Sequence, residues 1–175
     1  MDSNPRLLYA VRILLIFLIL TNLIFIYGFS MQTAEQSSEI SGGISTTVAE
    51  VVVKDFESKP EEEKKEIIFD IDKIVRKLAH VAEYATLAAF TFMLLSTWSI
   101  KLPWRLLFTL AGTALAGFVD ERLVQIRSDG RSPQIKDILI DTAGGLLGCG
   151  AVMLINWIIR AVLKKRSTSP KKELI

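Results

Sequence analysis

Four long apolar segments dominate the hydropathy pattern of this chain. They cover residues 13–29, 79–98, 104–119 and 138–159, and each is close to the length that a helix needs to cross a hydrocarbon core. Basic residues precede the first segment, as in a signal peptide, but no small-residue cleavage site follows it, so we interpret it as a retained span. The pattern predicts an all-α membrane protein built as a four-helix transmembrane bundle.

The stretch between the first and second apolar segments is polar. Residues 30–59 are rich in Ser, Thr, Glu and Gly, which predicts a flexible connection. Pro60 and the three glutamates after it are typical of a helix start. Isoleucines at helical spacing then indicate an interfacial amphipathic helix over residues 60–72, leading into the second span. We therefore expect an extracytoplasmic loop plus an amphipathic helix over residues 30–72.

Composition and charge agree with a single membrane domain over residues 1–175. Half of the residues are hydrophobic (50%), and the mean hydropathy is +0.38, which a soluble domain of this size rarely reaches. The net charge of +2 and the lack of a basic patch interleaved with aromatic residues argue against nucleic-acid binding. Cations around the span ends and in the tail at residues 160–175 favour cytoplasmic termini.

Polar residues concentrate where antiparallel spans would meet on one side of the membrane. That side receives the start of the second span, the end of the third and the start of the fourth. Glu83 lies inside an apolar stretch, where a lone carboxylate costs several kcal/mol, so it needs a partner or a proton. The candidate site residues are Arg76, His80, Glu83, Tyr84, Asp120, Glu121, Gln125, Arg131, Asp137 and Asp141.

Glycines continue the face of the fourth span that carries Asp141. Gly144 and Gly148 follow it at intervals of about one helical turn, and Gly117 lies one turn before Glu121 in the third span. Small residues let neighbouring helices approach closely in a membrane. The sequence therefore predicts that the acidic residues lie at the end of a tightly packed helix–helix contact.

The polar residues, taken in order along the chain, resemble the VanZ-like family. The matching motifs are Arg76-Lys77-x-x-His80-x-x-Glu83-Tyr84, then Asp120-Glu121 with Gln125 and Gly130-Arg131-Ser132, then Asp137-x-x-x-Asp141-Thr142-x-Gly144-x-x-x-Gly148. Phe29-Ser30-x-Gln32, with Ser37, Ser38 and Ser41, is also similar to the segment after the family's first helix. The chain departs from the family in a longer, acidic first loop and in the position of Gln125, one residue later than expected.

This resemblance implies a small multi-pass protein of the bacterial plasma membrane. Relatives in the family are associated with reduced susceptibility to teicoplanin-type glycopeptide antibiotics. The resemblance therefore suggests an envelope lipid or a lipid-linked cell-wall precursor as the partner.

Three interpretations of the polar cluster stay open. In the first, Arg76, His80 and Arg131 bind the phosphate of a head group at the outer leaflet, with Glu83, Asp120 and Asp141 orienting these cations. In the second, the protein is a membrane-embedded enzyme acting on a phospholipid or lipid-linked precursor, with His80 and Glu83 as catalytic candidates. In the third, the charges only fix how the helices dock. We favour the non-enzymatic binding role, and we expect no cofactor and no metal, because a single histidine cannot supply a multi-histidine zinc site.

Overall fold

The computed structural model describes residues 4–124 and 135–168, and these residues form seven helical elements. In chain order the elements are α1 (Pro5–Ser30), α2 (Ala34–Val52), η1 (Phe56–Ser58), α3 (Glu61–Leu95), α4 (Leu102–Val119), η2 (Asp120–Val124) and α5 (Ile135–Thr168). Four of them, α1, α3, α4 and α5, are long and apolar enough to cross a membrane. This confirms the predicted all-helical fold with four spans.

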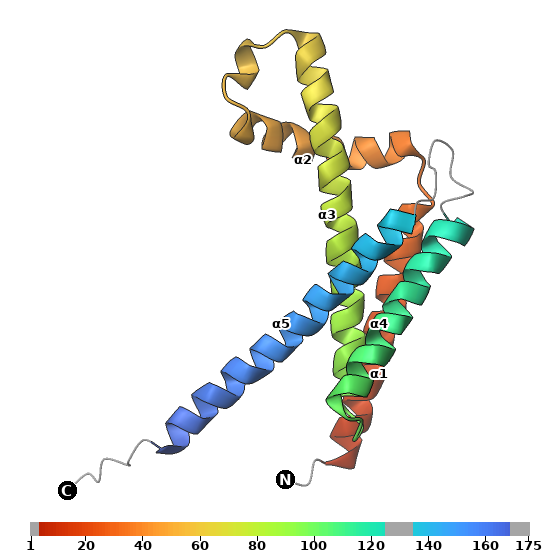
Figure 1. Cartoon of the computed structure of the whole chain (residues 1–175), viewed down its shortest axis with the longest axis vertical. Helices are drawn as coiled ribbons and strands as arrows, with labels where there is room; N and C mark the ends of the chain where they lie inside the picture. The colour runs from red at the N-terminus through yellow and green to blue at the C-terminus, as the bar shows by residue number, and fades with distance from the viewer. Residues whose placement is uncertain (1–3, 125–134, 169–175) are drawn as a thin grey trace, which may run out of the picture.

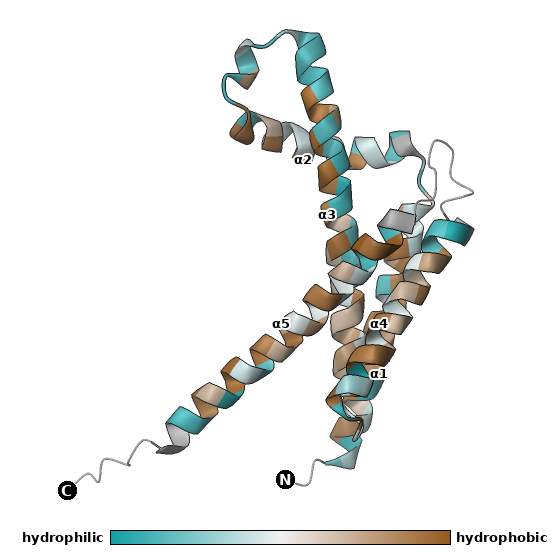
Figure 2. Ribbon diagram, in the orientation of Figure 1, coloured by the Kyte–Doolittle hydropathy of each residue, from teal (hydrophilic) through white to brown (hydrophobic). Residues whose placement is uncertain are grey.

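The spanning helices pack into a narrow bundle. In Figure 1, α1, α3 and α4 run alongside one another, while α5 crosses α3 and then diverges from it. One core cluster joins Ile26 of α1 to Tyr84 and Leu87 of α3 and Ala116 of α4. Many large apolar side chains on the outer surface are exposed, as lipid-facing positions are expected to be. Figure 2 shows that apolar residues predominate along the spans, whereas the first part of α3 carries many hydrophilic residues.

Glycines bring α5 against α3. A Cβ atom placed on Gly148 would lie 2.0 Å from the carbonyl oxygen of Ala85, and one on Gly144 would lie 2.7 Å from the carbonyl oxygen of Val81. Neither distance is tolerable for a real side chain, so these positions admit only glycine at this crossing. The close helix approach predicted from the small-residue face is therefore present.

The segment after the first span differs from the prediction. Most of residues 30–59 form α2, where we expected a flexible connection. A capping box starts this helix: Thr33 accepts from the backbone of Gln36, and the Gln36 side chain accepts from the backbone of Thr33. Serine-rich composition suggested a loop, but the serines on one face of α2 have a tertiary partner on α3.

The predicted amphipathic segment at residues 60–72 is helical and begins after Pro60, as its sequence indicates. It is not a separate helix, because it continues without interruption into the second span as α3. Figure 1 shows this first part of α3 extending beyond the other spans, with α2 lying across it. The additional short helix beside the bundle is therefore α2.

Candidate functional site

Polar residues from four elements meet at one end of the bundle. At this end Ser30 of α1 donates to Asp120 Oδ2 of η2 at 2.8 Å. His80 of α3 lies between two carboxylates: its Nδ1 is 4.0 Å from Glu83 Oε2 and 4.0 Å from Asp141 Oδ1 of α5. The structure thus joins side chains that are up to 90 residues apart in the sequence.

Several of these side chains are almost completely buried. Tyr84 and Asp120 have no exposed surface, and Glu121 and Asp141 are only 2% and 1% exposed. The Tyr84 ring stacks on His80 with 6.4 Å between centroids. In the part of the chain that the structure describes, the Tyr84 hydroxyl and Asp141 Oδ2 have no hydrogen-bond partner. Buried polar atoms without a partner are costly, which marks the region around them as a candidate site.

Glycine in α4 makes room for one of these carboxylates. A Cβ atom on Gly117 would lie 3.0 Å from Asp141 Oδ2, so the carboxylate of α5 packs directly against the backbone of α4. Any larger residue at Gly117 would have to move it. The position of Asp141 therefore depends on α4 as well as on α3 and α5.

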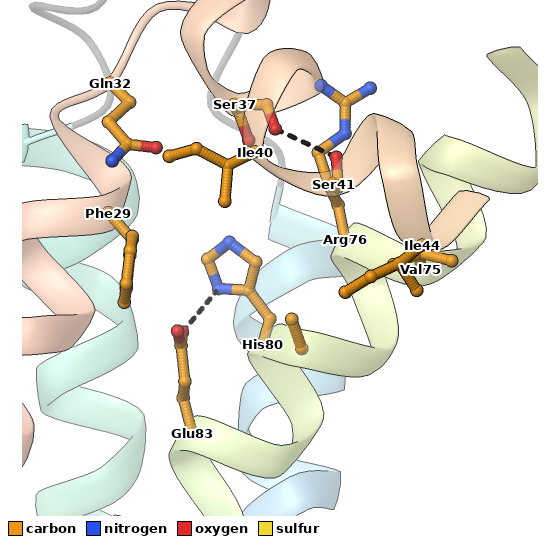
Figure 3. Close-up of a pocket in the computed structure, with 11 residues that line it drawn as sticks. Phe29, Gln32, Ser37, Ile40, Ser41, Ile44, Val75, Arg76, His80 and Glu83 are labelled. Carbon is orange, nitrogen blue, oxygen red and sulfur yellow. Dashed lines mark hydrogen bonds and ion pairs between the residues drawn. The ribbon is translucent and has the colours of Figure 1, made fainter. Parts of the chain in front are cut away.

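A pocket of about 210 Å³ opens beside His80, between the end of α1, α2 and α3 (Figure 3). The His80 ring projects into the space between Phe29 and Ile40, with Glu83 next to it. The lining combines polar and apolar groups: Phe29, Gln32, Ser37, Ile40, Ser41, Ile44, Val75, Arg76, Ala79, His80 and Glu83. The pocket therefore offers both polar and apolar groups to a ligand.

A second polar cluster holds Arg76 at the edge of this pocket. Asp72, only 3% exposed, accepts hydrogen bonds from Ser38 at 3.0 Å, from Ser45 at 3.1 Å and from Ser41. Arg76 Nη2 lies 3.1 Å from Asp72 Oδ2, and Arg76 Nη1 donates to Ser38 at 3.2 Å. This cluster attaches α2 to α3 and orients the guanidinium.

Asp72 and Ser45 were not selected by reasoning from the sequence. We expected Glu83, Asp120 and Asp141 to orient Arg76, and this stays a prediction; the ion pair of Arg76 with Asp72 was not anticipated. The available signal was spacing: Asp72 and Arg76 are one turn apart on α3. Ser38, Ser41 and Ser45 likewise share a face if residues 34–52 are taken as a helix.

The remaining predicted site residues are less informative. Asp137, in the first turn of α5, is partly exposed. Gln125 and Arg131 lie outside the described residues, so their predicted contribution stays a prediction. Within the described ranges, no group of three or more His, Cys, Asp or Glu side chains is placed to hold a metal ion.

Comparison with known proteins agrees with the motifs and the fold. A family model described as VanZ/LLP1 matches residues 13–156, a range that includes most of α1, all of α2, α3 and α4, and much of α5. Neither the curated proteins nor the solved structures contain a match. All three predicted groups of polar residues, at the start of the second span, the end of the third and the start of the fourth, fall inside the matched range. The chain therefore belongs to the VanZ/LLP1 family, and its four apolar helices make it a multi-pass membrane protein.

Proposed function

We propose that this protein binds the head group of a membrane lipid or lipid-linked cell-wall precursor at the outer leaflet. Through this binding it influences susceptibility to glycopeptide antibiotics. One observation carries the proposal: a pocket near the bundle end combines Arg76, His80 and Glu83 with an apolar wall. Binding at this place suits a family associated with glycopeptide susceptibility.

The polar lining residues of the pocket suit a zwitterionic or anionic group. Arg76 provides charge-assisted hydrogen bonds to a phosphate oxygen. It is already oriented by Asp72 and Ser38, so binding sacrifices little of its rotamer entropy. His80 adds a second nitrogen donor, and Glu83 can accept from an ammonium or hydroxyl group of the ligand.

The apolar lining residues accommodate the start of a lipid chain. These residues are Phe29, Ile40, Ile44 and Val75, and the side chains of Ile40 and Ile44 are each 60% exposed. Pockets for whole small molecules usually enclose roughly 300 to 1,000 Å³, so about 210 Å³ holds a head group and not an entire lipid. The rest of the ligand would remain in the bilayer.

The placement of the pocket at the outer leaflet rests on charge. The opposite end of the bundle carries the cations Arg6, Arg12, Lys101 and Arg105, and the positive-inside rule favours the cytoplasm for that end. The pocket then faces outward. This is the side on which cell-wall precursors and glycopeptides meet.

The test compares Arg76→Gln and His80→Gln with Lys77→Gln. Lys77 is the neighbouring exposed cation and does not line the pocket, so it controls for loss of one charge. Each variant is scored for membrane abundance, thermal stability in detergent, teicoplanin susceptibility of the host, and stabilisation by a short-chain polyprenyl phosphate. We expect His80→Gln to lose stabilisation and the susceptibility effect at normal abundance, while Lys77→Gln keeps both. Arg76→Gln should lose both as well, together with some thermal stability, because it also breaks the ion pair with the buried Asp72.

Other outcomes would contradict the proposal. Loss of abundance together with function would support a purely structural role for the charges. Equal behaviour of Arg76→Gln and Lys77→Gln would mean that general surface charge, and not the pocket, matters. Susceptibility that does not depend on the wild-type protein would separate this chain from the role associated with its family.

A membrane-embedded enzyme acting on the same class of ligand is the second candidate. It is favoured by the position of His80, whose Nδ1 lies equally far from the carboxylates of Glu83 and Asp141. Such an arrangement orients an imidazole for general base catalysis. The enzyme role predicts that His80→Gln abolishes turnover of a polyprenyl phosphate or phospholipid but spares its binding. Loss of binding in that variant would favour the non-enzymatic role.

A further inference from the structure

The opposite end of the bundle contains another cavity, of about 230 Å³, between α3, α4 and α5. It lies where α5 has diverged from the other spans (Figure 1). Its lining combines two arginines and an asparagine with aromatic and aliphatic groups: Phe92, Leu102, Arg105, Met153, Asn156, Trp157 and Arg160. Tryptophan and arginine at the end of a span are typical of the depth at which lipid head groups lie.

The diverging part of α5 leaves apolar surface beside this cavity. Leu154, Ile158, Ile159 and Leu163 are each about half exposed, at 46% to 59%. Figure 2 shows this part of α5 as largely hydrophobic where it runs apart from α3 and α4. Hydrocarbon chains are needed to cover such a surface. The cavity therefore adjoins a region suited to acyl chains.

Charge at this end has one sign. In the described portion of the chain, every ionisable Lys, Arg, Asp or Glu near the start of α1, the turn between α3 and α4, and the end of α5 is a cation: Arg6, Arg12, Lys101, Arg105, Arg160, Lys164 and Lys165. No carboxylate among the described residues pairs with Arg105 or Arg160. An anion bound at this end would therefore balance the positive charge.

Arg105 is held in place while part of its hydrogen-bonding capacity is unused. Its Nη1 donates to Ser96 at 2.8 Å, and its guanidinium lies over the Phe92 ring at 5.3 Å. The buried Nε atom has no hydrogen-bond partner among the described residues. A buried donor of this kind gains free energy when an acceptor arrives.

We propose that an anionic phospholipid of the leaflet at this end occupies the cavity. Its phosphate lies between Arg105 and Arg160, and its acyl chains follow the diverging face of α5. Basic pockets between spanning helices recognise anionic head groups in this way. Charge complementarity selects this occupant over a second copy of the chain, which would bring like charges together. The site is independent of the pocket around His80.

The test measures lipid retention by the full chain in native mass spectrometry. The wild type, Arg105→Gln/Arg160→Gln and the control Arg6→Gln/Lys101→Gln are each equilibrated with phosphatidylglycerol or phosphatidylcholine in mixed micelles. The control removes two cations from the same end but outside the cavity. A basic residue near an anionic head group contributes about fivefold in affinity. We therefore expect the double variant to bind phosphatidylglycerol about thirtyfold more weakly, and the control to bind like the wild type.

Glycerol phosphate provides a separate arm, because it has the phosphate and no acyl chains. We expect it not to displace the lipid; displacement at low concentration would assign the site to a small soluble anion. Equal retention of both lipids, or equal losses in the double variant and its control, would overturn the proposal. So would a wild-type dimer that excludes lipid. If Arg105→Gln prevents folding, Arg160→Gln alone decides, because Arg160 is exposed: a fivefold loss supports the site, and unchanged retention refutes it.

Discussion

Two buried carboxylates near the same end of the bundle have opposite surroundings. Asp72 receives three serine hydroxyls and a guanidinium at hydrogen-bond distance. Asp141 has His80 Nδ1 at 4.0 Å, and its Oδ2 has no hydrogen-bond partner in the described part of the chain. Both are nearly inaccessible, at 3% and 1% exposed. The two carboxylates are therefore almost equally buried, but Asp72 has many more hydrogen-bond partners than Asp141.

This difference distinguishes a carboxylate that holds two helices together from one that lies in a candidate binding site. A fully hydrogen-bonded carboxylate stabilises the contact that it makes and has no capacity left for a ligand. Long contacts beside a pocket are typical of a place where a ligand or a conformational change completes the interactions. The Asp72 cluster therefore attaches α2 to α3, whereas the region around His80 is the proposed binding site. The following predictions test this assignment, from the largest effect to the smallest.

The largest effect is expected for Asp72→Ala. This change leaves Arg76 without its carboxylate and three serines without their acceptor, and breaking a buried ion pair costs about 3 to 5 kcal/mol. We expect α2 to separate from α3 while the four spans remain assembled. Hydrogen exchange over residues 34–52 measures this directly. If the amides of α2 stayed as protected from exchange as in the wild type, Asp72 would not be what attaches α2 to α3.

Gly148→Ala should disturb the other cluster. Its Cβ would lie 2.0 Å from the carbonyl oxygen of Ala85, so α5 must move away from α3, at a cost of about 1 to 3 kcal/mol. That movement carries Asp141 away from His80 but leaves the Asp72 cluster in place. Gly150→Ala is the matched control, because no atom lies within 4 Å of its Cβ position. Thermal unfolding in detergent should distinguish the two, and similar melting temperatures would refute the close crossing.

Ser45→Ala removes one donor to Asp72 and keeps the others. A hydrogen bond to a charged group contributes roughly 1.5 to 3 kcal/mol, so the variant should weaken α2 protection less than Asp72→Ala does. Thr47→Ala serves as the control, because Thr47 is exposed and its hydroxyl bonds only within α2. Hydrogen exchange in α2 is again the measurement. Equal protection in the Ser45 and Thr47 variants would show that the serine contacts are dispensable.

The smallest stability effect is expected for His80→Gln. Its Nδ1 is 4.0 Å from each of the two carboxylates, and glutamine keeps a nitrogen donor and an oxygen acceptor at this position. We expect a loss of under about 1 kcal/mol in unfolding free energy, in the range of weak ion pairs, together with loss of ligand stabilisation. A destabilisation as large as that of Asp72→Ala would make the His80 region architectural as well.

Local sequence patterns were sufficient for the spans. Hydropathy over some 20 residues identifies a membrane helix, because every backbone polar group in a bilayer must be satisfied within the helix itself. The helices α1, α3, α4 and α5 all start before the predicted segments, by as little as two residues for α4 and by several turns for α3. At their ends, α5 continues for nine residues past its predicted segment, α4 ends where predicted, and α3 ends three residues earlier. The motifs that indicate the VanZ/LLP1 family are also local, and they selected most of the polar residues that the structure brings together.

Tertiary structure decided what the polar segments do. Residues 34–52 have the composition of a loop, and their helix is attached to α3 through Asp72, a contact between positions about 30 residues apart. The ion pair between Arg76 and Asp72 was not anticipated from the sequence. The spacing of Asp72 and Arg76 on α3 was a local signal for this ion pair, whereas the three serine donors to Asp72 depend on the position of α2. Periodicity reports the face of a single helix, whereas hydrogen-bond partners depend on how separate helices are placed in space.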